Sequence, residues 1–199
     1  MRTFVLFATL LLPCALPYPL LYTLQAQTSS PHSQTDLNRA LAGNWTGVLE
    51  YRDYSEPATS TKRVQLPTWL SITPSATSGS QTWHYIYDDG PTKVVEETDT
   101  ITFDLPASTY TESDNNKPPR LYKVSGLDTL RNGTGQLILT GPGTDNNQPA
   151  ETRITLTLRR NLLDILEETR PAASSEPFAF RHAFRFTRST PPPLLPPTK

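Results

Sequence analysis

Cysteine is almost absent from this chain of 199 residues, because Cys14 is the only one. A single cysteine excludes an internal disulfide framework and a metal site built from cysteines. Cys14 also lies in an N-terminal apolar segment that we expect to be removed. The remaining chain therefore has no thiol that could act as a nucleophile.

Apolar residues and net charge are also low, at 36% of the chain and −1 respectively. Threonine, serine, proline and asparagine make up the shortfall, and they favour strands, turns and loops over helices. We therefore expect an all-β protein. No basic stripe with interleaved aromatic residues is present in the sequence, which excludes nucleic acid as the expected partner.

The N-terminal segment, residues 1–26, predicts a secretory signal. Arg2 is followed by an apolar stretch at 4–12 that is too short to span a bilayer, and Ala26 is a small residue suited to cleavage. An uncleaved N-terminal anchor is the alternative. We expect a secreted or periplasmic protein with no membrane span once the signal is removed.

The polar stretch 27–40 is expected to be a flexible lead-in. Residues 190–199, "TPPPLLPPTK", are too rich in proline to join a sheet, so we expect a disordered tail. A docking peptide for a proline-reading domain is the alternative role for this tail. Residues 41–189 are then expected to form one β domain.

Strand signals separated by turn signals recur through this domain. They lie at 44–53, 62–73, 81–88, 93–104, 119–125, 136–141, 150–159, 161–169 and 176–188. Nine strands cannot close an antiparallel up-and-down barrel, which needs an even number. A short tenth strand at 108–112 resolves this, and eight strands with two irregular runs is the alternative. We therefore expect an antiparallel up-and-down β-barrel of about ten strands.

Ten strands also assign the connecting loops to the two ends of the barrel. The loops expected at one end, which we call the mouth, lie near 54–61, 88–92, 113–118, 141–149 and 169–176.

The stretch "LAGNWTGVLEY", residues 41–51, contains Gly43 and Trp45. It resembles the Gly-x-Trp motif that opens the first strand in the calycin superfamily, the lipocalins and their secreted, lipocalin-like bacterial relatives. The resemblance implies that Trp45 closes one barrel end and that an arginine of the last strand packs on its indole. Arg188 is the first candidate and Arg185 the second. The later motifs and the usual disulfides of lipocalins are missing, so lipid transport is not carried over.

The last strand, "FAFRHAFRFTR" at 178–188, alternates cleanly. We expect Arg181 and Arg185 on its outer face and an aromatic stripe on its inner face. The stripe consists of Phe178, Phe180, His182, Phe184 and Phe186. His182 is then a ligand contact, an axial haem ligand or a core histidine bonded to a neighbour, and the last is favoured.

Aromatic residues predict a ligand site inside the barrel, with a filled core as the alternative. The residues expected to line it are Tyr51, Trp83, Tyr85, Tyr87, Phe103, Phe180, His182 and Phe184.

Metal binding is weakly indicated by two similar loops, "SDNNKP" at 113–118 and "TDNNQP" at 144–149. Asp114, Asn115, Asp145 and Asn146 offer oxygen ligands that suit calcium. Turn chemistry selects the same residues. We therefore expect no metal and no cofactor.

Catalytic motifs are missing, because the sequence has neither a Gly-x-Ser-x-Gly motif nor a glycine-rich phosphate loop. The acidic residues Glu96, Glu97, Asp99, Glu167 and Glu168 are expected to lie on solvated strand faces. The leading hypothesis is non-covalent binding of a small apolar or aromatic molecule. The second is a filled barrel acting as an interaction module through its loops or tail, and the third is an enzyme.

Overall fold

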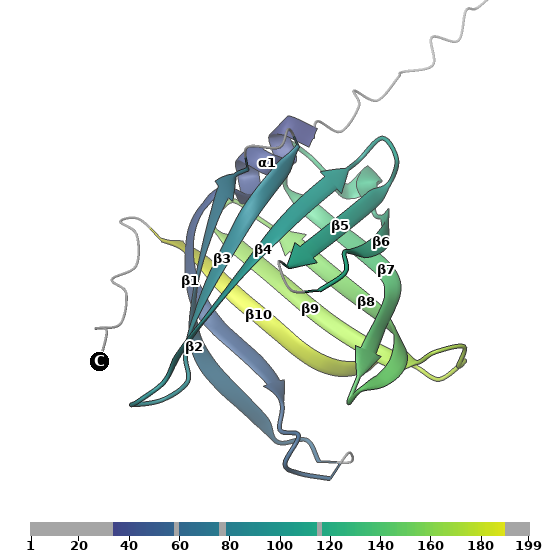
Figure 1. The fold of residues 1–199 in the computed structure, drawn as a ribbon. Coiled ribbons are helices and arrows are strands. Elements are labelled where there is room, and N and C mark those ends of the chain that lie inside the picture. The colour runs from purple at the N-terminus through teal and green to yellow at the C-terminus, as the bar shows by residue number, and fades with distance from the viewer. Residues whose placement is uncertain (1–33, 58–59, 76–78, 115–116, 190–199) are drawn as a thin grey trace, which may run out of the picture.

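The computed structural model describes residues 34–57, 60–75, 79–114 and 117–189. The predicted signal at 1–26, residues 27–33 of the expected lead-in and the tail at 190–199 lie outside the described residues. Within the described residues, one α-helix is followed by ten strands that form a closed barrel (Figure 1).

The ten described strands pair antiparallel, each with its neighbours in sequence, and β1 closes the barrel against β10. They are β1 (Gly43–Arg52), β2 (Arg63–Pro74), β3 (Ser80–Asp88), β4 (Val94–Asp104), β5 (Thr109–Asp114), β6 (Arg120–Ser125), β7 (Gly135–Asp145), β8 (Gln148–Leu158), β9 (Leu162–Pro171) and β10 (Ala179–Ser189). A short 3₁₀ turn, η1 (Leu127–Thr129), precedes β7. The expected all-β, up-and-down barrel is confirmed, with ten strands rather than eight.

The prediction of a loop at 141–149 is wrong. The β7–β8 ladder continues to the pair Asp145 and Gln148, and only Asn146 and Asn147 form the turn. Both asparagines have positive φ, 48° and 61°, which this residue type tolerates and a tight hairpin requires. The glycines and prolines that suggested a loop are instead part of the paired strands.

Residues 34–40 are not a flexible lead-in either, because α1 (Gln34–Leu41) covers the end of the barrel opposite the mouth (Figure 1). Leu37 and Leu41, one turn apart, are fully buried. Gln34 accepts a hydrogen bond from the backbone N–H of Leu105 at 3.2 Å. An eight-residue helix is marginal alone, so contacts with the barrel stabilise it.

Trp45 and Arg188 meet beneath this helix. The guanidinium carbon of Arg188 lies 4.1 Å from the centroid of the fully buried Trp45 ring. The indole Nε1 donates to the carbonyl of Leu41 at 2.9 Å. Gly43 has a φ of 124°, and a Cβ at this position would lie 2.8 Å from the Arg188 guanidinium. The geometry therefore explains why glycine precedes tryptophan here.

The barrel is filled on the side of α1, which we call the closed half. The buried side chains there include Trp45, Leu70, Ile72, Phe103, Leu137, Leu158, Leu163 and Phe186.

In the part of the chain that the structure describes, no helix combines the length and the apolar character that a membrane span requires.

Candidate functional site

A cavity of about 740 Å³ occupies the mouth half of the barrel. Strand alternation turns every second side chain of the surrounding strands into it. Six of the eight residues predicted to line the ligand site line this cavity. They are Tyr51, Trp83, Tyr85, Tyr87, His182 and Phe184.

The aromatic side of the cavity is built mainly by β3 and β10. Tyr85 and Tyr87 stack with centroids 5.9 Å apart, and Tyr85 also lies 5.4 Å from Phe184. Trp83 is 2% exposed and contacts Tyr85 at 6.3 Å between centroids. Aliphatic side chains complete this wall and include Leu139, Ile154, Leu156 and Ile165.

Phe103 is inside the barrel but does not line the cavity. It is 2% exposed and packs edge-on against Tyr110, with centroids 5.0 Å apart. Phe103 thus belongs to the closed half of the barrel.

Phe180 was predicted to face inward and instead lies on the outer face, with the guanidinium of Arg63 4.5 Å from its ring centroid. The cause is a β-bulge, because Phe180 pairs with Glu168 whereas His182 pairs with Glu167. The inserted residue, Arg181, breaks the alternation.

The same bulge explains why two further predictions are wrong. Phe178 packs on the outer surface between the guanidinium groups of Arg153 and Arg170, at 4.4 and 4.5 Å from its centroid. Arg181 lines the cavity beside His182 instead of facing outward. The aromatic stripe is therefore continuous only from His182 to Phe186.

Charged side chains also line the cavity. They are Glu97, Asp99, Glu112, Lys117, Arg120, Glu167 and Arg181. The expectation that Asp99 and Glu167 lie on solvated faces is wrong, because both are buried, whereas Glu97 lines the cavity and remains exposed. Glu97 and Asp99 share the parity of Ile101 on β4, which is the sequence signal that could have placed them inside.

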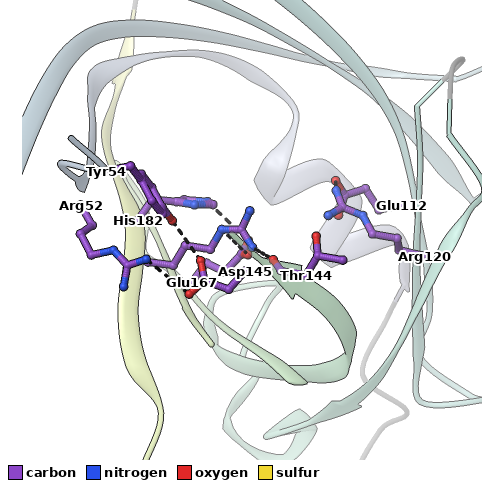
Figure 2. A network of polar contacts seen from close by, with 9 residues as sticks. Arg52, Tyr54, Glu112, Arg120, Thr144, Asp145, Glu167 and His182 are labelled. Atoms are coloured by element: carbon purple, nitrogen blue, oxygen red, sulfur yellow. Dashed lines mark hydrogen bonds and ion pairs between the residues drawn. The ribbon is translucent and has the colours of Figure 1, made fainter. Parts of the chain in front are cut away.

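Each basic residue of this lining contacts an acidic one. Arg120 bonds Glu112 across β5 and β6 (Figure 2). Arg181 lies 3.5 Å from Glu167. Lys117 lies 2.7 Å from Asp114.

His182 faces the same Glu167, with Nε2 3.4 Å from its carboxylate. Burial, aided by the positive charges of Arg181 and Arg120, lowers the pKa of His182 to about 4. The imidazole is therefore neutral at neutral pH, and its contact with Glu167 is polar rather than an ion pair.

Burial raises the pKa of several carboxyl groups in the cavity. The pKa of Asp99 rises to about 7, first through burial and then through the negative charges of Glu112 and Glu97. Burial also raises the pKa of Glu112 and of Glu167. The cavity thus holds an acidic group that is half ionised near neutral pH.

A polar bridge crosses the mouth between the end of β1 and the β7–β8 turn (Figure 2). The hydroxyl of Tyr54 donates to Asp145 at 3.2 Å, and Arg52 lies 3.5 Å from the same carboxylate. These strands are not neighbours in the barrel. We call the three residues the mouth bridge.

The two similar loops that suggested a calcium site do not bring their oxygen ligands together in the described residues. Asn115 lies outside the described residues, and Asp145 belongs to the mouth bridge. Asp114 instead lies near Glu97 and Asp99, and one oxygen of each falls within 4.8 Å of the others.

No family model matches the chain, and no curated protein sequence matches it either.

Proposed function

We propose that this protein binds a small molecule with an apolar, aromatic body non-covalently in the mouth half of the barrel. The observation that carries the proposal is the cavity of about 740 Å³ beside Trp83, Tyr85 and Phe184. Ligand sites typically enclose about 300–1,000 Å³ and combine apolar walls with a few polar groups. The closed sheet holds these walls in place before a ligand arrives.

The cavity weighs against the filled interaction module, because that role needs no interior space. Acid–base catalysis is the second candidate, since a pKa of about 7 lets Asp99 give and take a proton. Binding ranks first because the cavity volume and the aromatic wall support it without a reacting partner.

We also propose that the protein is exported and is a relative of the lipocalin-like barrels. Export rests on the signal-like sequence of residues 1–26. The relationship rests on Gly43, Trp45 and Arg188, which lie together at the closed end as the resemblance implies.

Native mass spectrometry of the protein, purified from its own host without detergent, tests binding. We expect the mass of a chain cleaved near Ala26 together with a reproducible small adduct. Ile165→Trp fills the cavity from β9 and should remove the adduct. Leu166→Trp places the same side chain on the outer face of the same strand and should retain it.

An adduct that persists in Ile165→Trp would place binding outside the cavity and contradict the proposal. A mass that retains residues 1–26 would contradict the cleaved signal without bearing on the cavity.

A further inference from the structure

We propose that the ligand is an amine, with its ammonium group between Asp99 and Glu97 and its aromatic body on Trp83 and Tyr85. This inference rests on the proposed function, and it adds the chemical class of the ligand.

The charges around the cavity leave two carboxyl groups without a cation. Glu112, Glu167 and Asp114 each contact a basic side chain. Among the described residues, neither Glu97 nor Asp99 has a basic group within 4.0 Å. All three basic groups of the lining are already neutralised, so an anionic ligand finds no free cation there.

Two buried polar atoms in the cavity wall also lack hydrogen-bond partners among the described residues. They are Oδ1 of Asp99 and Nε1 of Trp83. As whole residues, Asp99 is 7% exposed and Trp83 is 2% exposed. Buried polar groups are nearly always satisfied, and leaving one unpaired is costly. A ligand that donates to Asp99 removes the cost at Oδ1, whereas the Trp83 N–H is itself a donor and is not satisfied by an ammonium group.

The register of β3 and β4 sets these groups beside aromatic rings. Trp83 lies opposite Asp99, and Tyr85 lies opposite Glu97. Glu97 accepts a hydrogen bond from the hydroxyl of Tyr87 at 3.1 Å, which holds its carboxylate near the aromatic side. An ammonium group at this position gains both charge-assisted hydrogen bonds and attraction to the ring faces.

A metal ion fits this position less well than an amine. The third carboxylate of the group, Asp114, already has the ammonium of Lys117 at 2.7 Å. Glu97 and Asp99 then remain, and their two carboxylates supply at most four of the six to eight oxygens that calcium takes. The Lys117 contact shows instead that a primary ammonium is accommodated at this acidic group.

Paired probes separate the charge from the aromatic body. We would titrate the purified protein by calorimetry at about pH 8 with 1-naphthylmethylamine and with 1-naphthalenemethanol, its neutral counterpart. Asp99 is ionised at this pH and the amine is largely protonated. We expect the amine to bind at least about tenfold more tightly, because hydrogen bonds between charged groups are roughly twice as strong as neutral ones.

Variants on β4 test which carboxylates are responsible. Asp99→Asn and Glu97→Gln should each reduce the preference for the amine about tenfold while retaining affinity for the alcohol. Glu96→Gln is the matched control, because Glu96 lies on the outer face of the same strand, 3.1 Å from His84. It should leave both affinities unchanged.

Equal affinity for the two probes would overturn the amine assignment and leave the proposed function standing. Absence of binding by both would contradict the proposed function and the amine assignment with it. Calcium chloride titrated alone is the final test. Calcium binding that Asp99→Asn abolishes, together with equal binding of the two probes, would assign the acidic group to a metal instead.

Discussion

Asp99 illustrates how one residue couples cavity chemistry to stability. It is surrounded by Glu97 on its own strand, Glu112 and Asp114 on β5, and Arg120 on β6. Burial and the negative neighbours raise its pKa from 3.8 to about 7. The folded state therefore binds the Asp99 proton more tightly than the unfolded state does.

This shift predicts a pH effect of defined sign. The contribution of Asp99 to stability is fully present below about pH 4 and is lost as the pH rises through about 7. Asp99→Asn removes this loss, so the variant should gain stability relative to the wild type between these pH values. Urea denaturation of both proteins at a series of pH values measures the difference.

Other groups of the cavity also have shifted pKa values, and they are present in both proteins. Glu112 and Glu167 have raised pKa values and act with the same sign as Asp99. His182 has a lowered pKa and acts with the opposite sign, so its contribution is lost as the pH falls. Parallel stability curves for Asp99→Asn and the wild type would show that Asp99 is not responsible.

Arg188 holds the closed end of the barrel together through several contacts. It packs on Trp45 and donates to the carbonyls of Ala40 and Ala42. Arg188→Ala should lower the free energy of unfolding by about 2–4 kcal/mol, the sum of a cation–π contact and two hydrogen bonds.

Arg185→Ala is the control for this change. Arg185 is exposed on the same strand and lies 3.6 Å from Glu50, so its loss should cost below about 1 kcal/mol. Equal losses in the two variants, measured by chemical denaturation, would contradict the closing role of Arg188.

Individual residues differed in how far the sequence could place them. The Gly-x-Trp resemblance pointed to Trp45 and Arg188 because a motif fixes both residue type and position. Asp99 carried no such signal, since an acidic residue on a strand usually faces solvent. Its place inside follows from the parity of β4, and the raised pKa follows from neighbours on β5 that only the register identifies.

At the scale of elements, local irregularity limited prediction. Strand alternation correctly turned Phe184 and Phe186 inward, but the bulge at Arg181 reversed Phe180 and Phe178. A bulge inserts one residue into a period of two and leaves no clear mark in the sequence. It also supplies the cavity with Arg181, a charged group that regular alternation would place outside.

Helix α1 was missed for a related reason. Its eight residues contain few apolar positions, and its stability comes from contacts with β3 and the connections at the closed end. Asn38, for example, accepts a hydrogen bond from Gln81 through its carbonyl at 2.8 Å. Such contacts link residues about forty positions apart and cannot be seen in a local pattern.

The two faces of helix α1 should differ sharply in their effect on stability. Leu37→Ala should lower the free energy of unfolding by about 2–5 kcal/mol, because this fully buried side chain leaves a cavity behind. Arg39→Ala, at a position whose side chain is 72% exposed on the same helix, should change stability by less than about 0.5 kcal/mol. A Leu37→Ala variant as stable as Arg39→Ala, measured by thermal unfolding, would contradict the capping role of α1.

At the scale of the whole molecule, the barrel divides its length between stability and binding. The half beneath α1 is filled, and the half at the mouth keeps a cavity in which acidic groups have raised pKa values. The ten-stranded closure was predictable from an even strand count, because strand number is a global constraint. The extent of the cavity was not, since it depends on how side chains from ten strands fill the interior.

The mouth bridge predicts how quickly a ligand exchanges. Tyr54 and Arg52 hold Asp145 across the opening, so their contacts must break for the mouth to widen. Asp145→Ala should raise the association and dissociation rates of 1-naphthylmethylamine together, by up to about tenfold, with a nearly unchanged Kd. Stopped-flow measurement of tryptophan fluorescence, to which Trp83 in the cavity wall contributes, would determine both rates.

Asp89→Ala is the matched control, because Asp89 also lies at the mouth but its side chain pairs, among the described residues, only with Lys93 in its own turn. Its exchange rates should equal those of the wild type. If Asp145→Ala instead changed only the dissociation rate, Asp145 would contribute to the bound state rather than to the opening. If it changed neither rate, the ligand would pass the mouth without breaking the bridge. Access would then depend only on the spacing between the strand ends at the mouth.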